Sequence, residues 1–304
     1  MTAFTMGRLG VPFFLFLTGY LLLDRAFDSA KWQKFFHKNW IHLVITTEIW
    51  IILYDVFLRL FHYQHWSTTR LLKNILFLTP VNMPHIWYMP MIIGLYLFIP
   101  LAARGLQNLE LQTLRMPLGI ISIYAFAVPV FQVLWKDFSL GDIHSLLDYG
   151  FTGGVYGLYL LFGFLIKKGI LRNIHTPPLW ALFISAFCAT ILLQGFSYSR
   201  GATYNVWYDC GFLALSALTL FELFSRMAPH RHIPFLQWLS INSFGLYLIH
   251  FPFIMIFSGI LKHIPLMLPF KVLLLWCMVL SASCFICHEI NKRPSLSRLL
   301  LYKR

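Results

Sequence analysis

A tyrosine and a histidine lie one helical turn apart within an apolar stretch of the sequence. Tyr247 and His250 are three residues apart in the segment Ser240–His250, so on a helix their side chains are neighbours. Asn242 and Ser243 precede them on the same segment. Histidine is the side chain that most often acts as a general base, and we predict a catalytic role for His250. The alternative is a set of interhelical hydrogen bonds that only holds a helix bundle together.

Basic side chains with helical spacing form a second candidate group. Lys34, Lys38 and His42 follow one another at intervals of four residues, which places them on one face of a helix, and Glu48 lies further along. Such a polar face is typical of a cavity open to the cytoplasm. The alternatives are a lysine that extends to the membrane surface and a histidine that makes an ordinary interfacial hydrogen bond.

A third candidate, His85, lies between two prolines in the segment Pro84–Pro90. Trp87 and Tyr88 in the same segment are explained by the belt of aromatic residues found where helices leave a membrane. The aromatic belt accounts less well for the presence of His85, whose local backbone is fixed by the flanking prolines. We therefore predict His85 as a further candidate for catalysis.

No motif predicts a metal or a nucleotide site. The loop 136–149 contains three aspartates and a histidine, a composition that is more often a solvated loop than a metal site; they are Asp137, Asp142, His144 and Asp148. Cys284 and Cys287 form a C-x-x-C on an apolar segment without a second pair, which is typical of packing residues. Walker, Rossmann and H-E-x-x-H motifs are absent from the sequence.

The elements that position these residues are apolar segments. The chain has 304 residues, of which 59% are hydrophobic and only 12% charged, with a mean hydropathy of +0.69. A soluble domain carries about 25% charged residues, so this composition predicts a membrane protein with many spans. The net charge of +13 falls between the apolar segments, which the positive-inside rule explains without nucleic acid as a partner.

We predict an all-α bundle that forms a single domain over residues 1–304. It is expected to cross the membrane about nine times; the predicted spans are 9–24, 39–61, 85–103, 117–135, 150–166, 178–196, 205–225, 240–260 and 270–289. The longest connection, 62–84, is predicted to be extracytoplasmic. It contains the apolar run 71–78, which is too short to span and is expected to lie at the interface or to re-enter the membrane. Sixteen of the 24 basic residues lie on the side of the C-terminal tail 290–304, which is therefore predicted to be cytoplasmic. With nine spans, the N-terminus is predicted outside, without a cleavable signal peptide.

The sequence resembles the acyltransferase 3 family of bacterial inner-membrane proteins. Four segments carry the likeness in the family's order; they are VPFFLFLTGYLL at 11–22, HIWY at 85–88 with GLYL at 94–97 and Pro100, YGLYLLFG at 156–163, and SINSFGLYLIH at 240–250. Members of the family O-acylate cell-surface polysaccharides and related acceptors. Two departures stand out. The family usually has ten helices, the first of which carries a histidine, and that helix is not seen here. At the family's pair of arginines, the sequence has Asn39 and His42 with Lys38 alongside.

The resemblance implies transfer of an acyl group, as in an O-acetyltransferase, from cytoplasmic acetyl-CoA to a hydroxyl of lipopolysaccharide, another surface glycan or a lipid-linked sugar precursor. The CoA would be a co-substrate, with no tightly bound cofactor and no metal, and membrane lipids would surround the chain. Lys34 and Lys38 would bind the donor, and His42, His85 or His250 would act in catalysis. The acceptor would be bound by four residues, namely Arg8, Trp87, Tyr88 and Tyr247.

Two alternatives to an active transferase remain open from the sequence. One is a transporter or flippase, in which intramembrane polar residues line a pathway, although no inverted repeat is visible. The other is a catalytically inactive member of the family that lacks its first helix.

Overall fold

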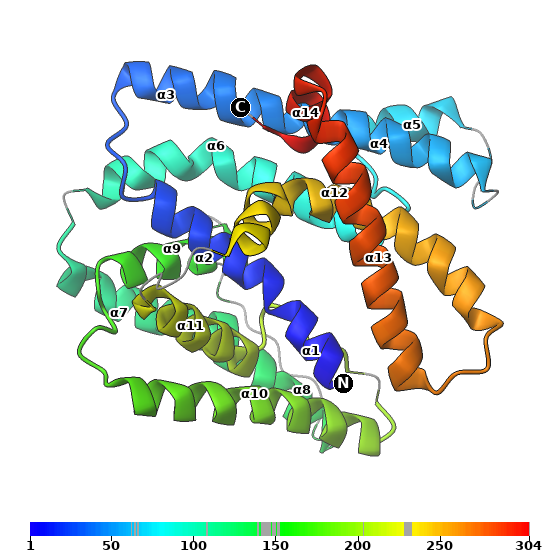
Figure 1. Cartoon of the computed structure of the whole chain (residues 1–304). Helices are drawn as coiled ribbons and strands as arrows, with labels where there is room; N and C mark the ends of the chain where they lie inside the picture. Colours follow the sequence, from blue (N-terminus) through cyan, green and yellow to red (C-terminus); the bar gives the residue numbers. More distant parts are fainter. Residues whose placement is uncertain are drawn as a thin grey trace. The chain divides into compact units, whose positions relative to one another are not determined.

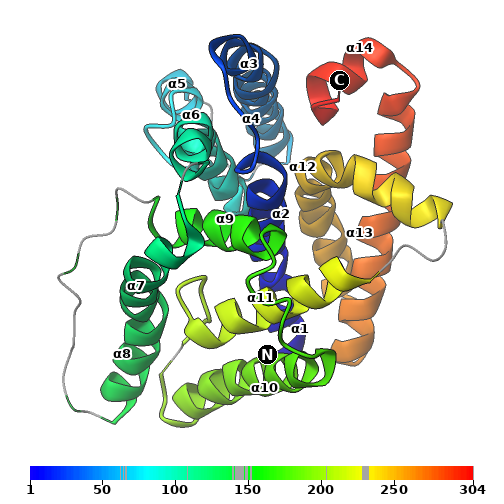
Figure 2. The same ribbon diagram turned by 90° about the vertical axis from the view of Figure 1, so that its left-hand side faces the viewer.

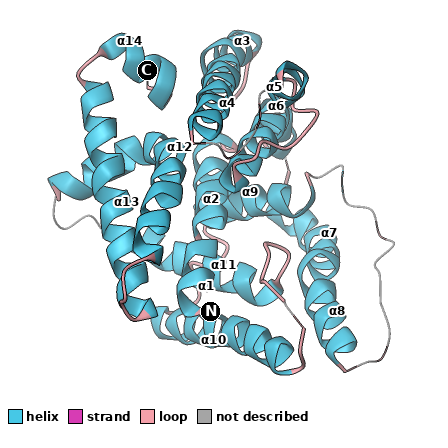
Figure 3. Ribbon diagram, turned by 90° about the vertical axis from the view of Figure 1, so that its right-hand side faces the viewer, coloured by secondary structure: helices cyan, strands magenta, loops and turns pink. Residues whose placement is uncertain are grey.

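The computed structural model describes residues 1–61, 63, 65, 67–107, 109–138, 140, 147, 150, 153–202, 204–227 and 233–303. These residues form helices and loops, and the described part contains no strand (Figure 3). The prediction of an all-α protein is confirmed. The chain divides into two compact units, the first made of 1–28 with 98–229 and the second of 29–97 with 230–304.

Unit 1 is built on α1 (Thr2–Arg8), α2 (Gly10–Leu22), α7 (Leu111–Ser122), α8 (Val128–Asp137), α9 (Gly154–Lys167), α10 (Thr176–Ser199) and α11 (Gly211–Arg226). A π-helical turn, η3 (Ile123–Ala127), joins α7 to α8. Within this unit α2 lies against α9, and α10 lies against α11 (Figures 1 and 2).

Unit 2 contains α3 (Ser29–Phe35), the π-helix η1 (Phe36–Ile41), α4 (His42–Leu60), α5 (Thr68–Ile75), the 3-10 helix η2 (Pro84–Trp87), α12 (Pro234–Lys262), α13 (Leu268–Asn291) and α14 (Pro294–Leu301). The helix α6 (Tyr88–Leu106) begins in this unit and continues into unit 1. Within unit 2, α12 lies against α13, and α14 contacts α4, α12 and α13 (Figure 3).

Seven helical stretches of the described chain are long and apolar enough to cross a membrane; they cover 2–22, 29–60, 84–106, 111–137, 176–199, 234–262 and 268–291. The other two predicted spans also fall on helices, α9 with 14 residues and α11 with 16. Helix α9 begins later than expected because Gly153 and Gly154 both have positive φ. The protein is therefore a multi-pass membrane protein.

Two helices extend beyond their predicted starts. The first continuous stretch begins at Thr2, because residues 2–7 are small or apolar, so Arg8 lies inside it rather than at its end. The second begins at Ser29, so Lys34 and Lys38 lie on helical turns, as their spacing of four residues predicted. In the connection 62–84, the predicted interfacial run forms α5, which ends at Ile75.

Helices α2 and α9 touch through glycines. A Cβ atom added to Gly19 would lie 1.8 Å from the carbonyl oxygen of Leu160, and one added to Gly163 would lie 2.0 Å from that of Phe16. Real Cβ atoms do not approach a carbonyl oxygen so closely, so only glycine permits this contact. Small residues at helix contacts are the usual means by which membrane helices pack closely. The glycine of the TGY segment at 18–20 is thus a packing residue.

An ion cluster joins the ends of the same two helices. The carboxylate of Asp24 lies 2.5 Å from Lys168 Nζ and 3.1 Å from Lys167 Nζ. The hydrogen bond from Lys168 lowers the pKa of Asp24 below its ordinary value of 3.8. Because the folded-state pKa is depressed, the cluster stabilises the fold above about pH 4 and loses its effect as the pH falls through the folded value.

Replacing Asp24 by asparagine should therefore destabilise the protein only slightly and only above acidic pH. The groups are partly exposed, so the expected loss at pH 7 is at most about 1 kcal/mol. Thermal unfolding of Asp24→Asn and of the parent in detergent checks this at pH 7 and pH 3. We expect the difference in unfolding temperature to shrink from pH 7 to pH 3, and a difference that stays the same would contradict the assignment.

The C-terminal helix α14 is held on η1 and α4. His42 Nε2 donates to the carbonyl of Arg298 (2.7 Å), Trp50 Nε1 donates to that of Leu300 (2.8 Å), and the Tyr302 hydroxyl donates to that of Asn39 (3.0 Å). The segment predicted as a basic tail thus contains a helix in contact with the face that carries His42. Its cytoplasmic side, like the single domain over 1–304, stays a prediction.

Candidate functional site

A four-residue 3-10 helix presents His85 to its neighbours. Pro84 occupies the first position of η2, and Met83 before it is extended, as residues before proline prefer. The His85 ring lies among four other rings, with centroid distances of 5.4 Å to Tyr54, 5.5 Å to Tyr247, 5.1 Å to His250 and 4.7 Å to Phe251. Tyr54 comes from α4, and the other three come from α12.

A proline in α12 leaves a carbonyl group free near His85. Pro252 lies inside the helix and has no N–H, so the carbonyl of Leu248, four residues earlier, lacks its usual partner. The Tyr54 hydroxyl donates to this carbonyl at 2.5 Å. A buried carbonyl without a partner would cost about 1–3 kcal/mol, so this hydrogen bond stabilises the kinked helix against α4.

The same hydrogen bond determines the tautomer of His85. A carbonyl oxygen can only accept, so the single proton of the Tyr54 hydroxyl is used at Leu248. His85 Nε2, 3.1 Å from the Tyr54 oxygen, must therefore be the donor in that contact. His85 Nδ1 is then an acceptor nitrogen, and it is buried with no hydrogen-bond partner among the described residues.

His250 is fixed in the opposite tautomer. Its Nδ1 lies 2.6 Å from the carbonyl oxygen of Tyr247, so Nδ1 carries the proton and Nε2 keeps its lone pair. The Tyr247 hydroxyl donates to the backbone carbonyl of His85 at 2.5 Å, which ties η2 to α12. His85 and His250, hereafter the histidine pair, thus form two adjacent imidazoles, each with one ring nitrogen able to accept a proton.

Four of the predicted site residues converge at this place. His85, Tyr247 and His250 are in contact, and the ring of Tyr88 lies 5.7 Å from that of Tyr247. Tyr54 was missed by sequence reasoning. Pro252, four residues after Leu248, was the available signal, because it predicts a free carbonyl that requires a donor from another helix.

The remaining predicted residues of unit 2 lie elsewhere. His42 contacts α14 and the ring of Tyr302, and it precedes Tyr54 by twelve residues, about 18 Å along a helix. Lys34 and Lys38 are exposed on α3 and η1. Trp87, two residues after His85, lines a separate pocket. The structure therefore does not bring His42 or the two lysines to the histidine pair.

Arg8 belongs to a separate cluster in unit 1. Its guanidinium lies 4.3 Å from the ring centre of Trp207 and 4.7 Å from that of Phe4, and Nη1 donates to the Tyr208 hydroxyl at 3.3 Å. Its Nε is buried without a partner among the described residues. Burial also raises the pKa of the neighbouring Asp209 carboxyl. Arg8 is thus enclosed by aromatic rings, of which Trp207 and Tyr208 were not predicted.

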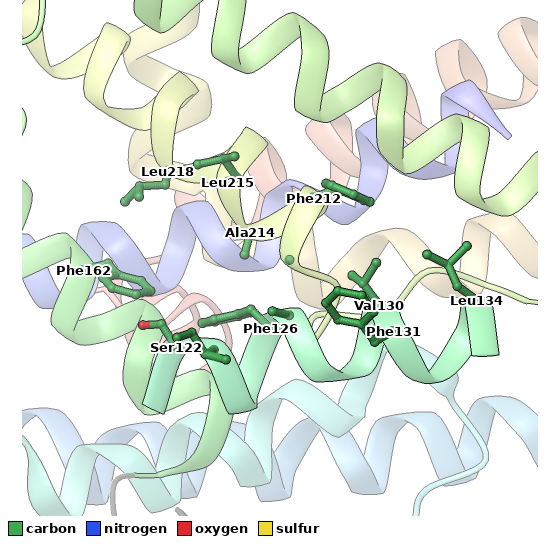
Figure 4. A pocket seen from close by; sticks show the side chains of 13 residues that line it. Ser122, Phe126, Val130, Phe131, Leu134, Phe162, Phe212, Ala214, Leu215 and Leu218 are labelled. Carbon is green, nitrogen blue, oxygen red and sulfur yellow. The ribbon is translucent and has the colours of Figure 1, made fainter. Parts of the chain in front are cut away.

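A pocket in unit 1 is apolar. It has a volume of about 500 Å³ between α7–η3–α8, α9 and α11. In Figure 4, Phe126 and Phe131 face the space from one side and Phe212 and Leu215 from another, and Ser122 supplies a lone hydroxyl. The lining residues that the structure describes are apolar apart from Ser122, a surface suited to hydrocarbon.

A metal centre finds no support in the described residues. They contain no group of three or more histidines, cysteines or carboxylates close enough to hold an ion. Asp137 is buried and accepts a hydrogen bond from Ser197 at 3.2 Å, while Asp142, His144 and Asp148 lie outside the described residues. The described cysteines are all free thiols.

The fold and the histidine pair define a multi-pass membrane protein with two adjacent imidazoles in an aromatic cluster. The chain matches the acyltransferase domain family, acyltransferase 3, over residues 1–288 and belongs to that family. The predicted family is confirmed. Searches among characterised proteins and among solved structures returned no match.

Proposed function

We propose that this membrane acyltransferase moves an acyl group, with acetyl as the first candidate, from acyl-CoA to a hydroxyl of a cell-surface glycan or its lipid-linked precursor. The observation that carries the proposal is the histidine pair, whose hydrogen bonds leave His85 Nδ1 and His250 Nε2 able to accept a proton. Family membership supplies the acyltransferase chemistry. The chain would lie in the bacterial inner membrane with its C-terminus in the cytoplasm.

In this reaction a histidine acts as the general base. One imidazole of the pair takes the proton of the acceptor hydroxyl while the oxygen attacks the thioester carbonyl. The carbon–sulfur bond then breaks, and the CoA thiolate takes the proton back from the imidazolium. The products are the O-acylated acceptor and CoA, with no net change at the histidine.

The donor would enter near α3 and η1. Lys34 and Lys38 carry positive charges suited to the phosphates of CoA, and both are exposed. Lys38 precedes Tyr54 by sixteen residues, about 24 Å along a helix, so the donor would have to extend along α4 from the lysines for its thioester to reach the histidine pair. His42, held by α14, has no role in proton transfer in this scheme.

The test is transfer of labelled acyl groups by the purified chain in proteoliposomes. Acetyl-CoA with a heavy-isotope acetyl group is supplied on one side, and glycan or lipid-linked sugar acceptors are analysed by mass spectrometry. We expect label in an ester on the acceptor, released by mild base. Label only in free acetate, or in no product, would refute the proposed transfer.

Replacing Tyr54 by phenylalanine should slow transfer without preventing folding. Tyr54 is a positioning residue, since its hydroxyl fixes the tautomer of His85. Without it, His85 can place its proton on either nitrogen, and we expect kcat to fall about tenfold, with KM for acyl-CoA unchanged.

The measurement is the pH profile of kcat for Tyr54→Phe and the parent. A role in positioning requires a changed profile, because the base is no longer held in one tautomer. A lower kcat with an identical profile would assign Tyr54 to packing alone.

A further inference from the structure

A pocket beside the histidine pair has the lining of a sugar subsite. It lies in unit 2 between α5, the loop 76–83, η2 and the first turn of α6, and its volume is about 320 Å³. Pockets for small ligands range from roughly 300 to 1,000 Å³, so this one suits a single sugar ring and excludes a long oligosaccharide. Trp87 and Pro90 line it on one side, and Asn74 and Thr79 on another.

Asn74 supplies the polar group aimed at this pocket. Its side chain is 4% exposed, and its Oδ1 accepts a hydrogen bond from the Thr79 hydroxyl at 2.7 Å. The Nδ2 group has no hydrogen-bond partner among the described residues. Asn74 lines the pocket, so its amide N–H groups can donate to a ligand oxygen there while Oδ1 keeps its bond to Thr79.

The loop that forms the wall contains a strained residue. Phe77 has a φ of 55°, a left-handed conformation that is costly for residues other than glycine. Phe77 lies in the turn that follows α5. There Leu78 N–H donates to the carbonyl of Lys73 at 2.8 Å, and Phe77 N–H donates to that of Asn74 at 3.1 Å. This turn directs the chain through Thr79 and Pro80, which both line the pocket.

The lining also restricts the charge of the ligand. Among the described lining residues none is acidic or basic, and Trp87 contributes its indole ring. The C–H face of a sugar ring packs against such an aromatic surface, and a buried N–H donor suits a hydroxyl or acetamido oxygen. An anionic sugar would have to give up its hydration without a cation to compensate.

The 3-10 helix η2 places this pocket next to the histidine pair. His85 and Trp87 are two residues apart, so their Cα atoms are separated by no more than about 7.6 Å. At three residues per turn, their side chains point about 120° apart. One short element thus directs a histidine of the pair to one side and the pocket's indole to another.

We propose that this pocket binds one uncharged sugar residue of the acceptor, with its ring on Trp87 and an oxygen accepting from Asn74 Nδ2. The proposal rests on the proposed function in that the bound sugar is the acyl acceptor or lies next to it. It adds Asn74 and Thr79 as specificity residues and defines the acceptor as a neutral glycan at this position.

Binding of simple sugars tests the subsite without relying on transfer. The full chain in nanodiscs is titrated with methyl glucoside, methyl N-acetylglucosaminide and methyl glucuronide, and binding is followed by saturation-transfer NMR. We expect at least one of the two neutral sugars to bind and the glucuronide to bind at least fivefold more weakly. Equal binding of all three, or of none, would overturn the proposal.

Variants locate the binding in this pocket. Asn74→Asp keeps the acceptor oxygen for Thr79 and removes both N–H donors, and we expect three- to tenfold weaker binding. Asn82, exposed in the same loop and outside the lining, gives the matched control, and Asn82→Asp should change binding less than twofold. Trp87→Ala should weaken binding about tenfold and Trp87→Phe less than threefold. Thermal unfolding shows whether each variant is folded. If Asn74→Asp does not fold, the effect of Trp87→Ala on sugar binding decides the test.

Transfer assays separate failure of the subsite from failure of the function. Acyl transfer that continues with unchanged KM for the glycan in Asn74→Asp and Trp87→Ala would overturn the subsite and leave the transferase. Sugar binding that depends on Asn74 and Trp87, in a chain that transfers no acyl group, would keep the subsite and refute the transferase.

Discussion

Replacement of either member of the histidine pair by an amide of similar shape should reduce acyl transfer by a factor of about 10² to 10⁴. His250→Asn keeps an N–H donor for the carbonyl of Tyr247 and removes the acceptor nitrogen. His85→Gln keeps a donor that can reach the Tyr54 oxygen and likewise removes the ring nitrogen that could accept a proton. Since both variants preserve the hydrogen bonds that order the cluster, a loss of rate reports on proton transfer.

The two histidines need not contribute equally. The variant with the larger loss in kcat identifies the base, and the other histidine then orders the acceptor and affects mainly KM. His42→Ala is the comparison. It removes one hydrogen bond to α14, so its expected cost is about 1 kcal/mol of stability with less than a tenfold effect on rate. If His42→Ala loses as much activity as His250→Asn, the base lies near η1 and the assignment to the pair is wrong.

The second large effect concerns the fold of unit 1. Gly19→Val should prevent α2 from packing on α9, because even the first carbon of the new side chain would lie 1.8 Å from a backbone carbonyl oxygen. Overpacking in a well-packed core costs typically about 1–3 kcal/mol, and here the obstacle is backbone that cannot change its rotamer. We expect a loss of more than about 3 kcal/mol and little folded protein in detergent.

A glycine on the same helix provides the control. A Cβ atom added to Gly10 would have nothing within 4 Å, so Gly10→Ala should leave stability unchanged or raise it by up to about 1 kcal/mol. Size-exclusion profiles and thermal unfolding of the two variants measure the contrast. A Gly19→Val protein as stable as the parent would show that α2 and α9 are not in close contact.

The helices could be predicted from the sequence because their apolar length is a local property of the chain. That His85, Tyr247 and His250 come together in the fold could be predicted less well than the helices. Tyr247 and His250 were identified as neighbours through helical spacing, but their contact with His85 joins segments 162 residues apart, which no local pattern encodes. The resemblance to a family indicated all three residues as candidates without placing them together.

Arg8 and His42 lie in surroundings that the sequence did not predict, and each case has a physical reason. Arg8 was expected at a helix end because a charge usually marks one, yet helix formation continues through the small and apolar residues before it. The contacts of Arg8 with Trp207 and Tyr208 were missed because these two residues lie outside any helix, where no periodic pattern relates them to Arg8. His42 has the residue type of a base, but its ring is used to hold the C-terminal helix.

The position of α14 also bears on how the chain is made. Asn39 and Tyr302, joined by a hydrogen bond, are 263 residues apart, so at about 5–20 residues per second the ribosome delivers the second roughly 13 to 50 s after the first. During that interval the carbonyls of Arg298 and Leu300, which accept from His42 and Trp50 in the folded protein, have not yet been synthesised. Unit 2 therefore closes only after translation of its last helix, and the early segment depends until then on water, lipid or the insertion machinery for its polar partners.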